Sequence, residues 1–563
     1  MRAAARLLPL APPALLALIL TAPVAAGLAG ALAPAFGLPD APGLQEWRRL
    51  FDQPGLATSI RLSLVTGLVS SLAALTLSTL IVAALHGTAA FALLRRGLAP
   101  LLSVPHAAAA LGLAFLIAPS GWIARALSPW ATGWTEPPDL LILNDPGGWA
   151  LTLGLVAKEL PFLLLMTLAA LPQTDAARQM AVAASLGHSR SSGFLLAVWP
   201  ALARQLRLPV AAVLAYGMTV VDMALILGPT LPPTLAVRIT QWMTAPDLSD
   251  RGLAAAAALL QLALVLAALA FWRLAGRATC SLTRSLATSG WRGRGADRVL
   301  RPLAATLGAT ATLSLAAGLA GLALWSFTGP WSFPAALPAS LTLGTWAQNG
   351  ASLAARTGTT LALAILSAAS ALALVVAALE SLSRRGTSPG PRLLALIWLP
   401  LVVPQVAFLP GLQVFTLAAG TEGTRLSVAA AHLVFVLPYV WLSLAPAWAA
   451  WNPRIALAAA ALGAPPSRIL WRLRLPMLLR PLLTAFAVGL AVSIGQYLPT
   501  LLIGGGRVET LTTEAVALAS GGSRRVAGAA AIAQTLLPMA GFWLALAMPA
   551  LAFRHRRGMG EAP

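Results

Sequence analysis

The chain has 563 residues, of which 58 % are hydrophobic and only 10 % are charged. An ordinary globular domain has roughly 25 % charged residues, and a soluble core could not bury this much apolar surface. The composition therefore excludes a soluble protein and predicts an all-α polytopic membrane protein. The net charge of +21 does not indicate nucleic-acid binding, because the cations are scattered in short loops rather than gathered on one surface.

Apolar runs of about 20 residues predict membrane-spanning helices. We expect about twelve: 7–33, 62–85, 97–118, 147–172, 208–229, 252–272, 303–327, 357–379, 393–418, 426–447, 482–503 and 526–553. The first run follows Arg2 and Arg6 and leads into small residues from Ala25 to Ala31, a pattern that a cleaved signal peptide would share. We expect an uncleaved helix, and cleavage would remove one span without inverting the others.

The distribution of arginine predicts the orientation. With Met1 inside, the inner and outer segments have nearly the same total length, but the inner segments carry more than twice as many arginines. Such an excess of cations in loops of equal total length marks the cytoplasmic side. We therefore expect a multi-pass protein of the bacterial inner membrane, with both termini in the cytoplasm and residues 119–146 in the periplasm.

Two polar inner loops share a spacing that indicates a duplication. In each loop a Leu-Gly pair is followed by a proline at the same distance from the glycine, first at Gly187 and Pro200 and again at Gly463 and Pro476. Upstream, Pro105 with Gly112 matches Pro404 with Gly411, at a slightly longer offset. Six spans per copy keep both copies in the same orientation, so the sequence predicts two parallel six-helix repeats.

The repeats divide the chain into three predicted parts. The first half covers 1–272, with its inner loop at about 173–207, and the second half covers 303–563, with its inner loop at about 448–481. A basic cytoplasmic connector, 273–302, joins them. Within each loop, Gly187 or Gly463 would permit a tight turn between two short helices. Pro200 or Pro476 would then break the second segment where the chain re-enters the membrane.

These loops resemble the loop by which permease subunits of binding-protein-dependent ABC importers contact their ATPases. The resemblance extends over about 60–550, as two fused permease halves. The family's pattern is Glu-Ala-Ala, a glycine after three more residues, and then a distant Leu-Pro. This chain departs from it at two positions, because Ala181 and Leu457 stand in place of the glutamate, and Trp199 stands in place of the leucine in the first loop. The matching residues, which the resemblance assigns to ATPase coupling, are Ala183, Leu186, Gly187, Pro200, Ala459, Leu462, Gly463, Leu475 and Pro476.

The resemblance also implies partners. They are two copies of a cytosolic ABC ATPase, a periplasmic solute-binding protein, the lipid bilayer and a small solute, which in fused permeases of this kind is thiamine, ferric iron or a related substrate. No catalytic motif supports an enzyme. A phosphate-binding loop ends in Gly-Lys-Ser/Thr, whereas the sole lysine, Lys158, precedes Glu159. The five histidines and single cysteine show no metal-ligand spacing, so we expect no metal and no cofactor.

Three charges lie deep in predicted spans. They are Lys158, Glu159 and Asp222, and such groups usually face the bundle interior and find partners. Depths along the two spans predict a Lys158–Asp222 ion pair, which would leave Glu159 for the solute or for gating. The equivalent second-half positions, Phe435, Val436 and Leu498, are apolar.

Two other classes of protein stay open at this point. An ion-coupled secondary transporter with two six-helix halves would use Glu159 and Asp222 for coupling, but it needs no cytoplasmic docking loops. A membrane glycosyltransferase would use outer acids such as Asp40, Glu46 or Asp52, although these residues form no paired-acid motif.

Overall fold

The computed structural model describes residues 11–38 and 42–553. The described residues are almost entirely helical, with one isolated antiparallel bridge between Thr328 and Leu341. The helices up to the connector are α2 (Ala11–Ala35), α3 (Gln45–Phe51), α4 (Leu56–Leu85), α5 (Ala89–Leu101), α6 (His106–Ile117), α7 (Trp122–Leu127), α8 (Trp149–Ala170), α9 (Ala176–Ser185), α10 (Arg190–Gly193), α11 (Trp199–Gln205), α12 (Arg207–Thr219), α13 (Asp222–Leu227), α14 (Leu235–Thr244) and α15 (Asp250–Thr288).

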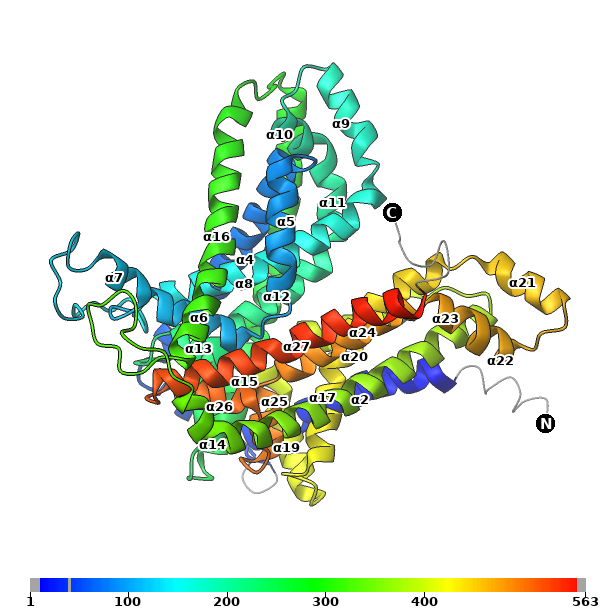
Figure 1. Cartoon of the computed structure of the whole chain (residues 1–563). Helices are drawn as coiled ribbons and strands as arrows, with labels where there is room; N and C mark the ends of the chain where they lie inside the picture. Colours follow the sequence, from blue (N-terminus) through cyan, green and yellow to red (C-terminus); the bar gives the residue numbers. More distant parts are fainter. Residues whose placement is uncertain (1–10, 39–41, 554–563) are drawn as a thin grey trace.

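The second half repeats much of this order. Its helices are α16 (Ala296–Ser326), α17 (Gly344–Arg384), α18 (Pro391–Val402), α19 (Gln405–Ala418), α20 (Arg425–Ala450), α21 (Pro453–Ala461), α22 (Pro466–Ile469), α23 (Leu475–Met477), α24 (Leu479–Ile494), α25 (Leu498–Gly504), α26 (Leu511–Ala519) and α27 (Arg524–Ala552). Figure 1 shows two diverging arms, one ending in α9–α11 and the other in α21–α23.

The predicted spans fall on these helices or on broken pairs of them. By length and hydropathy, nine helices of the described residues can each cross a membrane, or up to eleven spans form if two bent pairs are counted. The sequence predicts one more, at 208–229, where α12 and α13 are each too short to cross alone. The span predicted at 7–33 begins outside the described residues.

Four predicted spans are interrupted, and local sequence explains each interruption. Pro105 and Pro404 immediately precede α6 and α19, and proline cannot donate the backbone hydrogen bond that would continue the preceding helix. At the second of these sites, α18 and α19 meet at an angle of 89°. The α12–α13 break follows a β-branched run, 219–221, and the α24–α25 break lies between Gly495 and Pro499.

The first long helix of each half packs against helices of the other half. Helix α2 packs along α19 and also against α17 and α18, while α16 packs along α6 and against α4 and α5. On the buried face of α2, Leu16 and Leu20 are therefore part of the second-half core. This exchange ties the two halves together.

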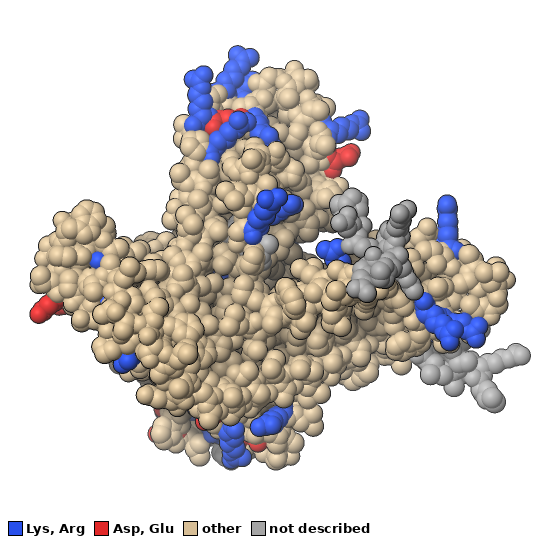
Figure 2. All heavy atoms as spheres, viewed as in Figure 1, with Lys and Arg blue, Asp and Glu red and all other residues tan. Residues whose placement is uncertain are grey.

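The charges of the visible face lie mainly at its extremities. Figure 2 shows Lys and Arg side chains near the tips of both arms, whereas the broad surface between them is nearly free of charge. This is the distribution expected of a protein whose middle faces lipid and whose ends face water.

Candidate functional site

The two inner loops form the same turn at the tips of the two arms. In the first loop the Gly187 N–H donates to Ala184 O (3.0 Å) and the His188 N–H donates to Ala183 O (3.1 Å). This pair of bonds closes the end of α9 when the glycine adopts a left-handed conformation, and φ of Gly187 is +79°. The glycine turn expected from the sequence is thus present.

The second loop has the same geometry. The Gly463 N–H donates to Ala460 O (2.9 Å) and the Ala464 N–H donates to Ala459 O (3.0 Å), with φ of Gly463 at +82°. Ala183 and Ala459 therefore supply equivalent carbonyl groups at the ends of α9 and α21.

The two prolines differ in their effect. Pro200 lies in the first turn of α11, which continues to Gln205, so the break predicted there is wrong. Pro476 lies in α23, which ends at Met477, and the chain bends by 75° into α24, as the sequence predicted. Two π-helical stretches, Phe194–Val198 and Leu470–Arg474, stand at equivalent positions of the two repeats. A missing proline N–H removes one i→i−4 bond. In the first loop the wider π turn accommodates this loss and α11 continues, whereas in the second loop the helix ends at Met477.

Both turns present apolar side chains to solvent. Leu186 is 57 % exposed and Leu462 is 89 % exposed, and each immediately precedes its glycine. Leu457, at the position of the family's glutamate, is also exposed, as is Trp471. Exposed apolar residues at the end of a projecting element are typical of a surface that another protein covers.

Different contacts hold the two loops in place. In the second loop, the Arg474 guanidinium lies 3.1 Å from the Glu380 carboxylate of α17 and donates to Trp448 O at 3.2 Å. It also stacks on the Trp448 ring, 4.1 Å from the ring centroid. Val198 occupies the equivalent position in the first loop, which the connector holds instead through Asp297.

A cavity of about 250 Å³ lies between the two halves. All four helix breaks line it: Ser103 to Pro105, Val220 and Val221, Val403 and Pro404, and Gly495 to Tyr497. Helices α8 and α20, together with α12, α18 and α24, contribute most of the remaining wall. A break in a membrane helix exposes backbone polar groups, and such breaks are tolerated where they line a cavity.

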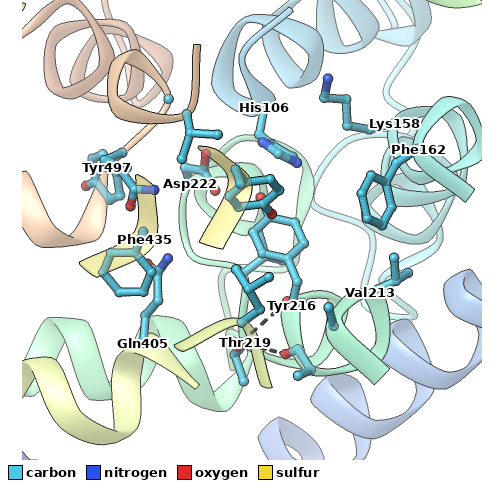
Figure 3. Close-up of a pocket in the computed structure, with 18 of the residues that line it drawn as sticks. His106, Lys158, Phe162, Val213, Tyr216, Thr219, Asp222, Gln405, Phe435 and Tyr497 are labelled. Atoms are coloured by element: carbon cyan, nitrogen blue, oxygen red, sulfur yellow. Dashed lines mark hydrogen bonds between the residues drawn. The ribbon is translucent and has the colours of Figure 1, made fainter. Parts of the chain in front are cut away.

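Lys158, Glu159 and Asp222 all line this cavity, but the predicted Lys158–Asp222 ion pair is wrong. In Figure 3 Lys158 lies apart from Asp222, with His106 between them in this view. The Lys158 ammonium donates to Leu101 O and Leu102 O, both at 3.2 Å. Leu101 O also accepts from the Val104 N–H (3.3 Å), and a cation at a helix C-terminus satisfies such carbonyl groups.

The two carboxylates have other neighbours. A Glu159 oxygen lies 3.6 Å from Nε2 of His106, and Asp222, at the start of α13, interacts with Tyr216 and His106. The His106 and Tyr216 rings lie 4.7 Å apart. Glu159 and Asp222 are 6 % and 7 % exposed, so both carboxylates are buried in the protein at the cavity wall.

Most polar residues of the cavity wall were not predicted from the sequence. His106 and Gln405 each follow the proline of a break and are equivalent positions of the two repeats, so the repeated prolines were the signal that could have located them. No sequence pattern indicated the tyrosines. The missed residues that line the cavity are His106, Tyr216, Gln405, Tyr439, Gln496 and Tyr497.

Of the outer acids, Glu46 has its carboxylate paired with Arg49 at 3.0 Å, and Asp40 lies outside the described residues. Within the described parts of the chain, no group of three or more His, Cys, Asp or Glu residues could hold a metal ion.

Two arms with equivalent projecting turns, around a cavity lined by broken helices, define a membrane permease built from two fused halves. Comparison with known proteins gives the family. The family described as "Binding-protein-dependent transport system inner membrane component" matches residues 370–548. The "Inner membrane ABC transporter permease protein YnjC" of Escherichia coli (strain K12) is 33 % identical over 506 residues, covering 88 % of this chain and 89 % of that protein.

The chain therefore belongs to the ABC transporter permeases of binding-protein-dependent transport systems. This confirms the family that the two loops resembled and the all-helical polytopic fold. No solved structure matches the chain.

Proposed function

We propose that this permease carries a small solute inward across the bacterial inner membrane, from a periplasmic binding protein to the cytoplasm. Two cytosolic ATPase subunits dock on the two loops, one on the Gly187 turn and one on the Gly463 turn. Their closure on ATP moves the two arms together. Rigid-body motion of two halves about a shared site is an established way to open a pathway alternately to each side.

The observation that carries this proposal is the equivalence of the two turns. The same hydrogen bonds, the same left-handed glycine and the same π-helical stretch occur at the tips of both arms. A soluble motor with two subunits requires two such contact points, each rigidly connected to one arm. Each loop continues directly into a helix that reaches a cavity break, α12 in the first half and α24 in the second.

The cavity supports a pathway between the halves. Residues of both halves line it, and the breaks of α12 and α24 lie on its wall. Any rotation of one arm against the other therefore changes the shape of the cavity. We assign Glu159 and Asp222 to solute contact or gating, whereas Lys158 holds the end of α5.

A transport assay tests the proposal. The permease would be reconstituted in liposomes with the ATPase that co-purifies with it and with its solute-binding protein, and ATP would be enclosed. Uptake that depends on enclosed ATP and on the binding protein supports the importer. Uptake that persists without ATP and collapses with an ionophore would instead support ion-coupled transport through Glu159 and Asp222, the alternative that these two buried carboxylates favour.

A further inference from the structure

The two docking turns differ in what surrounds them. A Cβ atom added to Gly463 would meet nothing within 4 Å, whereas one added to Gly187 would lie 3.7 Å from an Arg294 guanidinium nitrogen. Arg294 belongs to the connector between the halves. The second turn is therefore bare, and the first turn has a segment of connector beside it.

Hydrogen bonds fasten this segment to the first loop. The Ser189 N–H donates to Arg292 O (3.2 Å), and the Ser192 hydroxyl donates to the same oxygen (2.8 Å). In return, Arg292 Nε donates to Leu186 O (2.9 Å). Gly293 packs so closely that an added Cβ would lie 2.6 Å from the Ser192 Cβ. The connector and the loop thus form one continuous surface.

Asp297 completes the attachment. Its carboxylate accepts from the Arg190 N–H (3.1 Å) and the Ser191 N–H (3.0 Å), which are free donors at the start of α10. The Arg301 guanidinium lies 3.5 Å from the same carboxylate. Asp297 is therefore occupied inside the junction and does not neutralise the arginines on its outward face.

The outward face of this junction is basic and aromatic. Trp291 is 45 % exposed, and Arg294 and Arg298 are exposed beside it. Within the described chain, neither arginine forms an ion pair. The second turn presents Leu462 and Trp471 without comparable connector cover.

We propose that the connector segment 289–298 is part of the docking surface for the ATPase subunit on the first loop. This surface fits an acidic rim on that subunit, which Arg294 and Arg298 face while Trp291 and Leu186 pack into its groove. The second ATPase subunit docks on the Gly463 loop alone, so the two contacts are chemically unequal. The inference rests on the proposed function, because it assumes that an ATPase covers both turns.

Site-directed cross-linking tests this directly. Cys280 would first be replaced by serine in the full-length permease, and single cysteines would be placed as Trp291→Cys, Leu186→Cys and Leu462→Cys. The partner is the ABC ATPase that co-purifies with the permease. We expect all three positions to cross-link to it. Cross-links from Leu186→Cys and Leu462→Cys without one from Trp291→Cys would overturn the proposal that the connector contacts the ATPase. The proposed importer function would still stand. Failure of all three would overturn the proposed function itself.

Charge reversal gives a second readout. We expect Arg294→Glu combined with Arg298→Glu to weaken cross-linking at Leu186→Cys about tenfold and to change the salt dependence of ATPase binding. Cross-linking at Leu462→Cys should not change. The matched control is Arg277→Glu, an exposed arginine on the helical part of the connector. An equal loss from the control, or an equal loss at both loops, would overturn the inference.

Discussion

Gly112 on α6 and Gly318 on α16 approach so closely that a Cβ atom added to Gly318 would lie 2.7 Å from the carbonyl carbon of Gly112. A similar contact joins α2 and α19. A Cβ atom added to Gly30 on α2 would lie 2.7 Å from the carbonyl oxygen of Gly411 on α19. Small residues allow membrane helices to pack backbone to backbone. These two glycine contacts are where each half receives the first helix of the other.

Gly318→Ala should therefore destabilise the permease. The added methyl group must push α16 away from α6, and overpacking of this kind costs about 1–3 kcal/mol. The matched control is Gly358→Ala on α17, where an added Cβ would meet nothing within 4 Å. Thermal unfolding in detergent, followed by size-exclusion chromatography, should show a lower midpoint for Gly318→Ala alone. Equal midpoints for the two variants would contradict the close packing.

Gly187→Val and Gly463→Val should uncouple ATP hydrolysis from transport. A β-branched residue is strained at the positive φ of these turns, so the tip of each arm must change shape. We expect the variants to insert and to lose most solute-stimulated ATPase activity. Gly386→Val is the control, because this glycine also has a positive φ, +65°, in a loop that our orientation places on the same side of the membrane. Normal coupling in a Gly187→Val, Gly463→Val double variant would remove both turns from the mechanism.

Lys158→Met should destabilise the protein, and Asp222→Leu should not rescue it. The substitution removes the ammonium donor from Leu102 O, whereas Leu101 O keeps its bond from the Val104 N–H, and an unsatisfied buried group costs about 1–3 kcal/mol. Lys158→Arg keeps a donor and should retain more of the stability. Denaturation midpoints of the single and double variants provide the measurement. Recovery of stability in the Lys158→Met, Asp222→Leu double variant would contradict this interpretation and support a Lys158–Asp222 ion pair.

Glu159→Gln and Asp222→Asn should impair solute uptake more than they impair assembly. Both carboxylates line the cavity, and both substitutions preserve side-chain size while removing charge. ATP-dependent uptake in liposomes, compared with the yield of folded permease, separates the two effects. If both variants transport at the normal rate, these residues have no role in the pathway.

The orientation in the membrane is a further expectation. A reporter that is active only in the cytoplasm should be active when fused after Arg557, because the excess of arginine in the inner loops places the C-terminus there. A reporter that is active only in the periplasm should be active when inserted within 119–146. The reverse pattern of reporter activity would show that the predicted orientation is wrong.

Much of the local structure was predictable because local residues determine it. Apolar runs predicted the helices, and the Leu-Gly pairs at Gly187 and Gly463 predicted turns that only the left-handed conformation of glycine completes. The effect of Pro476 was predicted correctly, because the helix ends at Met477 and the chain bends by 75°, but the effect of Pro200 was not. Sequence alone shows that a backbone donor is missing at Pro200, but not that the helix widens to a π turn and then continues to Gln205.

The sequence by itself determined the class of protein, its helical segments, the duplication and the two projecting turns. These properties depend on composition, on hydrophobic periodicity and on residues within one turn of each other. Only the tertiary structure decided that α2 and α16 exchange halves, that Lys158 holds the end of α5, and that the connector joins the first loop. Alanine- and leucine-rich helix faces are nearly interchangeable, so their partners depend on close packing between distant segments. The partner of a buried charge likewise depends on which polar groups the fold places near it. For Lys158 these groups are two backbone carbonyls at the end of a broken helix.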